Sequence, residues 1–236
     1  VEIHYTNVNN SQIIGSGYSM GGMVGEIDGS KLTITSSEFY NSTITNVEGD
    51  DIYSIGGIIG ETLSSVVDVT NTITDNVTIN GDRYVGGMFG EISYSTVRIV
   101  GALVHLSTLN GATNIGGVVG KIVESTAEFN NSTISALDIN TSYTSGGLVG
   151  YTENSSFDIN ELSVFSTITP IVDTLQYVGG LFGQLRLTHV HISGTETDVS
   201  VTNVMRSFGN IAGSVLDSYI ETALYEATTE LTTDSS

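Results

Sequence analysis

The phrase Gly-Gly-apolar-apolar-Gly recurs along this chain of 236 residues at a nearly constant spacing. Six copies are complete, and a seventh reads Gly209-Asn210-Ile211-Ala212-Gly213. A period of roughly 30 residues is typical of repeat proteins, in which each unit buries its apolar face only by stacking on its neighbours. The first and fifth intervals between copies are slightly longer than the others. The glycines of the repeat are Gly21, Gly22, Gly25, Gly56, Gly57, Gly60, Gly86, Gly87, Gly90, Gly116, Gly117, Gly120, Gly146, Gly147, Gly150, Gly179, Gly180, Gly183, Gly209 and Gly213.

A strand is predicted nine to thirteen residues after the start of each phrase. Apolar and polar residues alternate there with a period of two, as in Leu32-Thr33-Ile34 and Val67-Asp68-Val69, which indicates a strand with one buried face. A small hydroxyl residue precedes this strand in every copy. These residues are Ser30, Ser65, Ser95, Ser125, Ser155, Thr188 and Ser218.

Two further strands complete each repeat. The second follows about eight residues later, as in Val77–Ile79, and in four copies it ends at an Asn: Asn80, Asn110, Asn140 and Asn203. Since Asn tolerates the left-handed backbone region, we expect a corner there. The third strand is expected to run through the phrase, as in Tyr84–Ile92.

Three strands per repeat predict a three-sided coil. The predicted fold class is therefore all-β, a right-handed parallel β-helix of seven to eight coils. The two longer repeats are interpreted as loop insertions near Glu48–Ile52 and Thr169–Leu175.

The glycines permit two explanations, positive backbone torsion angles or close approach of successive coils. Asn210 replaces the second glycine of the last phrase. Because Asn is the residue other than Gly that best tolerates a positive torsion, this replacement favours a torsional reason at the second position.

The solenoid is predicted to span residues 1–220, followed by a C-terminal cap or acidic Thr-rich tail over 221–236. Ser218–Leu231 fits either a short capping helix or one more strand followed by a tail. Residues 1–20 fit part of an earlier coil with an open edge. Since the chain starts at Val1 and carries no signal peptide, we expect a mature product or a fragment.

Charge restricts the classes of partner. The chain has 26 acidic and 6 Lys or Arg residues, a formal net charge of −20, and no cysteine. This charge repels phosphates and anionic lipids, so we expect no nucleic-acid partner. No apolar run approaches the length of about 18 residues that a membrane span needs, so no membrane insertion is expected.

Gly146-Gly147-Leu148-Val149-Gly150-Tyr151, followed by a Ser/Asn turn and an alternating strand, resembles the GLUG repeat of bacterial, archaeal and protist surface proteins and adhesins. The copies at Gly116 and Gly179 fit the same motif, and repetition extends the resemblance over nearly the whole chain. The resemblance implies a parallel β-helix in a secreted or surface-anchored protein. It supplies no catalytic residue.

Few residues suggest a chemical site. Glu128 and Asp158 fall next to each other in a predicted outward row, Asp68, Arg98, Glu128 and Asp158, and are candidate calcium ligands. Arg98 is expected to form a cross-strand charge pair in this row. His189 and His191 share a strand face and have the spacing of metal ligands, but two exposed histidines are the preferred interpretation.

Two other readings of the pattern are disfavoured. Gly120-Lys121 lacks the glycine and the hydroxyl residue of a phosphate-binding loop, because Ile115 and Ile122 stand at those places. The Thr-x-Thr pairs, such as Thr33/Thr35 and Thr72/Thr74, do not keep one register, which argues against an ice-binding face.

Seven asparagines lie in Asn-x-Ser/Thr sequences and are candidates for glycosylation if the protein is secreted through a glycosylating pathway. They are Asn9, Asn41, Asn76, Asn130, Asn131, Asn140 and Asn154.

These patterns predict a structural or adhesive repeat module of an extracellular or cell-surface protein that assembles end to end into a stalk or filament. We expect no enzymatic activity and no cofactor, and partners that are copies of itself, other surface proteins or glycans. The alternative is a β-helical carbohydrate-active enzyme or a carbohydrate-binding module, which would place clustered carboxylates on one face.

Overall fold

The computed structural model describes residues 1–47, 54–141, 143–170, 177–202 and 207–232. The predicted insertions near Glu48–Ile52 and Thr169–Leu175 lie outside these residues, apart from Thr169 and Pro170. The predicted corner at Asn203 also lies outside them. The described chain forms an all-β parallel solenoid with one coil per repeat, as the sequence predicted, and contains no helix.

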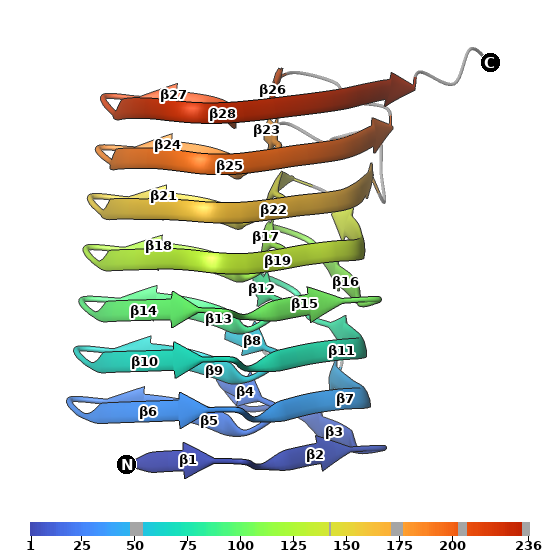
Figure 1. Ribbon diagram of the computed structural model, residues 1–236. Coiled ribbons are helices and arrows are strands. Elements are labelled where there is room, and N and C mark those ends of the chain that lie inside the picture. The colour runs from blue at the N-terminus through green and yellow to red at the C-terminus, as the bar shows by residue number, and fades with distance from the viewer. Residues whose placement is uncertain (48–53, 142, 171–176, 203–206, 233–236) are drawn as a thin grey trace.

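Three parallel sheets run along the solenoid (Figure 1). Sheet A has 14 strands, and sheets B and C have seven each. Sheet A contains β1 (Glu2–His4), β2 (Asn7–Asn9), β3 (Gln12–Gly15), β6 (Lys31–Thr35), β7 (Glu38–Asn46), β10 (Val66–Thr70), β11 (Ile73–Asn80), β14 (Thr96–Val100), β15 (Leu103–His105), β16 (Thr108–Gly111), β19 (Thr126–Thr141), β22 (Ser156–Pro170), β25 (His189–Thr202) and β28 (Tyr219–Thr232).

Sheets B and C meet at the glycine phrase. Sheet B contains β4 (Ser19–Gly21), β8 (Ser54–Gly56), β12 (Tyr84–Gly86), β17 (Asn114–Gly116), β20 (Thr144–Gly146), β23 (Tyr177–Gly179) and β26 (Ser207–Gly209). Sheet C contains β5 (Val24–Asp28), β9 (Ile59–Leu63), β13 (Phe89–Ser93), β18 (Val119–Val123), β21 (Val149–Glu153), β24 (Phe182–Arg186) and β27 (Ala212–Leu216).

The prediction of three sides is confirmed, but the strands are divided among them differently. The first and second predicted strands share sheet A, and from β19 onward they form one continuous strand. The predicted third strand, Tyr84–Ile92, breaks at the phrase, because β12 ends at Gly86 and β13 begins at Phe89. The phrase is therefore a corner between two sheets.

Close packing explains the repeat glycines, so the torsional interpretation is wrong. Neither the repeat glycines nor Asn210 has a positive φ among the described residues. A Cβ on Gly87 would lie 2.2 Å from the carbonyl oxygen of Gly117 in the next coil. A Cβ on Gly90 would lie 2.3 Å from the nitrogen of Ile55 in the preceding coil. The second glycine thus faces the next coil, and the third faces the preceding one.

Residues with a positive φ, in the left-handed backbone region, do occur elsewhere: one stands immediately before each residue of the hydroxyl row. Tyr94 and Glu124, for example, have φ of 52° and 47° and precede Ser95 and Ser125. Five hydroxyls of the row each accept a backbone N–H from the coil before them, as in Ser95 N to Ser125 Oγ at 3.0 Å; they belong to Ser65, Ser95, Ser125, Ser155 and Ser218. The Ser95 hydroxyl donates to the Ser93 carbonyl at 2.7 Å. The row thereby satisfies backbone groups at a repeated corner, where an unpaired buried group would be costly.

The predicted Asn corner is wrong for Asn80, Asn110 and Asn140, none of which has a positive φ. Their side chains instead form a ladder along sheet A. Asn110 Nδ2 donates to Asn80 Oδ1 at 2.7 Å, and Asn140 Nδ2 donates to Asn110 Oδ1 at 2.8 Å. Equivalent amides one coil apart can bond in this way because parallel strands lie about 4.8 Å apart.

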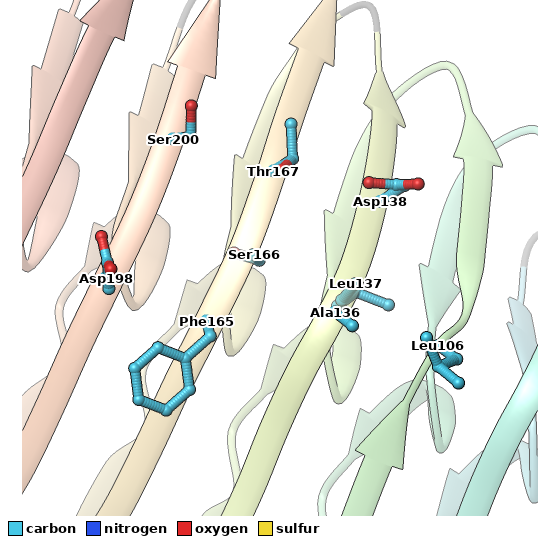
Figure 2. A pocket seen from close by; sticks show the side chains of 9 residues that line it. All are labelled: Leu106, Ala136, Leu137, Asp138, Phe165, Ser166, Thr167, Asp198 and Ser200. Carbon is cyan, nitrogen blue, oxygen red and sulfur yellow. The ribbon is translucent and has the colours of Figure 1, made fainter.

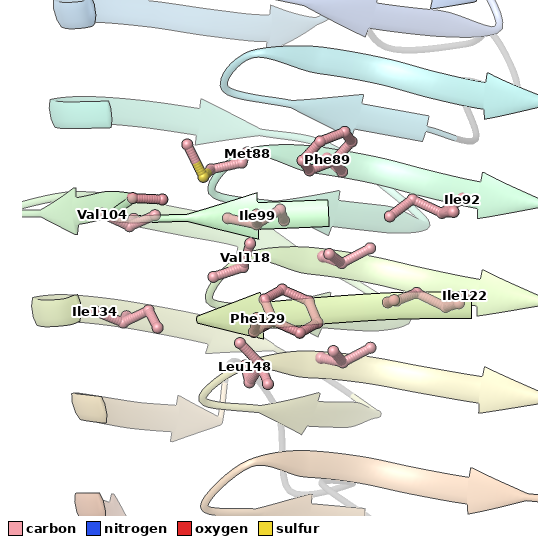
Figure 3. Packing of buried hydrophobic residues seen from close by; sticks show 14 of the residues in the cluster. Met88, Phe89, Ile92, Ile99, Val104, Val118, Ile122, Phe129, Ile134 and Leu148 are labelled. Carbon is pink, nitrogen blue, oxygen red and sulfur yellow. The ribbon is translucent and has the colours of Figure 1, made fainter. Parts of the chain in front are cut away.

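Inward side chains of all three sheets form one core (Figure 3). Phe89 and Phe129 are fully buried at its centre. The Phe157 ring lies 6.4 Å from that of Phe129 and 5.2 Å from that of Phe182. The core therefore runs continuously from coil to coil, as the sequence period requires.

At the C-terminal end the strand alternative is the one observed. β28 pairs in parallel with β25 from Tyr219 to Thr232, so residues 221–232 continue the solenoid. Among the described residues, no helix has the length and apolarity to cross a membrane.

Candidate functional site

The regular course of sheet A changes between β19 and β22. In the earlier coils a second left-handed residue kinks the strand, with φ between 44° and 50°. These residues are Asn10, Asn41, Asn76, Leu106 and Ala136. β22 contains no such residue after Glu161, and Phe165 takes the place of the kink. The register accordingly shifts between Ile134 and Leu137.

A hollow of about 510 Å³ lies at this discontinuity, on the outer face of sheet A (Figure 2). Its apolar lining comes from Leu106, Ala136, Leu137 and Phe165. Phe165 is half-buried and points outward, because its neighbours Val164 and Ser166 point into the core. Leu106 is 55% exposed. The hollow therefore offers an aromatic ring and aliphatic groups to solvent.

The polar lining contains two exposed carboxylates. Asp138, Thr167 and Ser200 are register partners on β19, β22 and β25, and Asp198 is the partner of Phe165. Within the described part of the chain, no ion pair involves Asp138 or Asp198. The site combines an aromatic face, two negative charges and hydroxyls, which suits a ligand that carries a positive charge on an apolar stem.

Sequence reasoning missed this site because its signal is hidden in the spacing. Asn160 pairs with Asn130 and Ser166 with Leu137, so β22 is one residue shorter than β19 over this stretch. The repeat as a whole is nevertheless longer than its neighbours, because the phrase that pairs with Gly146 starts at Gly179. The repeat length thus hides the one-residue deletion in β22, because a longer insertion follows it before the next phrase. A residue-by-residue alignment of the two repeats that places Phe165 opposite Ala136 would have revealed the missing residue.

The predicted outward row is confirmed, because Asp68, Arg98, Glu128 and Asp158 are successive register partners. The expected charge pair is present, with Arg98 Nε 3.5 Å from Glu128 Oε1. Asp158 Oδ1 lies 3.0 Å from His191 Nδ1. The two candidate calcium ligands are therefore neighbours, and each is engaged by a basic side chain on its other side.

His189 and His191 lie on the outer face of β25, as predicted. The ring of His189 lies 5.1 Å from that of Tyr219, and His191 contacts Asp158. The two histidines thus have different partners. In the described ranges, no group of three or more His, Cys, Asp or Glu side chains could hold a metal ion.

The glycosylation candidates divide into two structural classes. Asn41, Asn76, Asn131 and Asn154 are exposed and left-handed, with φ between 47° and 50°. Asn9 is exposed beside the left-handed Asn10, whereas Asn130 and Asn140 lie half-buried in stacked amide rows. The residue two positions after each of the four left-handed asparagines is an outward-facing hydroxyl residue of sheet A, which completes the Asn-x-Ser/Thr sequence: Thr43, Thr78, Thr133 or Ser156.

An ion pair within sheet C, covered by a ring from sheet B, was not predicted. Lys121 Nζ lies 2.9 Å from Glu91 Oε1 and 4.4 Å from the centroid of the Tyr84 ring. Burial alone would lower the pKa of Lys121, but the Glu91 carboxylate and the Tyr84 hydroxyl outweigh it and raise that pKa. The Gly120-Lys121 sequence therefore contributes a structural ion pair.

Of the Thr-x-Thr pairs, Thr72 and Thr74 are buried and point into the core, so this pair does not lie on an outer face.

Comparisons with known proteins give no family. No family model matches the chain, and no curated protein matches it. Among solved structures the chain is similar to HetL, a pentapeptide repeat protein involved in heterocyst differentiation regulation from the cyanobacterium Nostoc sp. strain PCC 7120. The identity is 9% over 92% of this chain and 87% of that chain, with a TM-score of 0.19. Because this likeness is too low to carry an argument and GLUG-type membership is not shown, the solenoid assignment rests on the chain's own strand pairing.

Proposed function

We propose that this chain is a structural and adhesive module of an extracellular or cell-surface protein, and that it binds a basic partner protein through the Phe165 hollow. The observation that carries the proposal is the outward-facing, half-buried ring of Phe165 with Asp138 and Asp198 beside it in one hollow. A Lys or Arg side chain would place its stem on Phe165 and its charge at the carboxylates.

The rest of the molecule is consistent with a binding role. The net charge of −20 attracts a basic surface over distance and speeds its encounter. Two other hollows, of about 410 and 420 Å³, are smaller than the one at Phe165. At the N-terminal end, β1, β4 and β5 are edge strands of the described sheets, and a further coil added there would lengthen the module into a stalk.

Calorimetric titration of the protein with a hexalysine peptide, at low and at moderate salt, tests the binding site. We expect Phe165→Ala and Asp138→Asn to weaken binding by about tenfold each, which corresponds to about 1.4 kcal/mol. Glu26→Gln is the matched control, because it removes one exposed charge from sheet C. Equal losses in the control and the site variants would show that only the overall charge acts.

Two further outcomes bear on the rival classes. Salt-insensitive binding of neutral oligosaccharides that depends on Phe165 would favour a carbohydrate-binding module, and turnover that is abolished by Asp138→Asn would favour the enzyme. Labelling of intact source cells with an antibody tests the location. A signal only after permeabilisation would contradict the surface assignment.

A further inference from the structure

The second glycine of the phrase is the position that faces the next coil. A Cβ on Gly57, Gly87 or Gly117 would lie 2.1, 2.2 or 2.0 Å from the carbonyl oxygen of the same position one coil later. Real Cβ atoms essentially never approach another heavy atom within 3.0 Å. Every coil that carries another coil of this geometry therefore needs glycine at this position.

Asn210 occupies this position in the last phrase. Gly180, one coil earlier, still obeys the rule, because its Cβ would lie 2.1 Å from the carbonyl oxygen of Asn210. Asn210 has no positive φ, so backbone torsion does not explain the exchange. β26 and β27, on either side of Asn210, are the edge strands of sheets B and C among the described residues. A coil stacked on them with the usual geometry would press its carbonyl oxygen into the Cβ of Asn210.

Tyr225 provides a second, independent feature of the same coil. It lies on β28 as the register partner of Thr195, a buried residue. Its hydroxyl donates to the carbonyl oxygen of Asn210 at 2.8 Å and lies 2.9 Å from Thr197 Oγ1. The side chain thus crosses the interior of the last coil from sheet A to the glycine corner, and it packs partly buried against the core.

We infer that Asn210 and Tyr225 close the C-terminal face of the solenoid to stacking by a second copy of this chain. At the N-terminal coil the residue at the outward-facing third position of the phrase is Gly25, which has no side chain to obstruct a neighbouring coil. The two faces therefore differ at the positions that face a neighbouring coil, and the C-terminal face is the one closed to a further coil. This inference goes beyond the proposed binding function and does not depend on the Phe165 hollow.

The mass of the protein in solution, measured by light scattering over a concentration series, tests the inference. We expect the wild-type chain to stay at one mass, whereas Asn210→Gly with Tyr225→Thr associates head to tail as the concentration rises. Asn210→Ala with Tyr225→Thr is the matched control, because it keeps the Cβ, and we expect it to stay at one mass. Circular dichroism and a melting curve establish that each variant is folded.

Disulfide trapping gives a second readout for the same pair of substitutions. Ser19 and Ser207 end the same register row in sheet B, so head-to-tail stacking would place their Cα atoms about 4.8 Å apart, within disulfide range. The chain has no cysteine of its own. We expect Ser19→Cys and Ser207→Cys chains to cross-link when both carry Asn210→Gly with Tyr225→Thr, but not when both keep Asn210 and Tyr225. Equal cross-linking in both backgrounds, or none in either, would overturn the inference.

Discussion

A methyl group on Gly87 would lie 2.2 Å from the carbonyl oxygen of Gly117, the equivalent residue one coil later in the chain. The glycine is thus required by its neighbour in the next coil, while its own φ is ordinary. Because the same contact recurs from Gly22 to Gly180, the phrase records how closely the coils approach. Asn210 stands at the equivalent place in the last phrase, between β26 and β27 at the edges of the described sheets B and C.

Gly87→Ala should therefore destabilise the protein severely, by more than about 3 kcal/mol, because the Gly117 carbonyl and the Val104 side chain must both move. Asn210→Ala, at the equivalent place in the last coil, should cost about 1 kcal/mol or less. Urea unfolding of the two variants measures the difference. Similar losses in both would contradict a packing role for the second glycine.

The hydroxyl row should be sensitive to loss of a single oxygen. Ser95→Ala removes the acceptor of the buried Ser65 N–H, and we expect a loss of about 1–3 kcal/mol. Ser163→Ala, at a half-buried position on the outer face of sheet A, is the control and should change stability by about 0.5 kcal/mol or less. Thermal melts compare the two, and equal shifts would mean that the row is incidental.

Lys121→Met should reduce the free energy of unfolding by about 1–3 kcal/mol, because it leaves the largely buried Glu91 carboxylate without its cation. Lys31 makes a looser contact with Asp68, at 3.8 Å, and its side chain is 69% exposed. Lys31→Met should therefore cost about 0.5 kcal/mol or less. A larger loss at Lys31 than at Lys121 would show that burial does not decide the value of these pairs.

Stability should fall as the pH rises above about 10, the ordinary value for Tyr. Burial raises the pKa of Tyr225, and its contact with Thr197 opposes this only in part. The folded chain therefore keeps a proton that the unfolded chain releases, so the free energy of unfolding decreases with rising pH. Tyr225→Phe should make this decrease shallower in urea titrations. Tyr5→Phe, at a residue 81% exposed, is the control, and an equal change there would refute the assignment.

Part of the candidate chemistry could be read from the sequence, and part could not. The row from Asp68 to Asp158, with its Arg98–Glu128 pair, follows directly from the period of the repeat. The Phe165 hollow does not, because a one-residue deletion in β22 is compensated in length before the next phrase. The ligand class proposed for it depends on side chains from three strands that only the register brings together.

The sequence by itself determined the period, the alternation of buried and exposed residues, and hence the parallel solenoid with three sides. These properties are local and repeat along the chain, so they survive without knowledge of contacts. Only the tertiary structure decided why the glycines recur, that Asn80, Asn110 and Asn140 form a ladder, and that β12 and β13 belong to different sheets. The physical reason is that each of these depends on atoms from coils one repeat apart in the chain, brought within bonding or collision distance by stacking at about 4.8 Å.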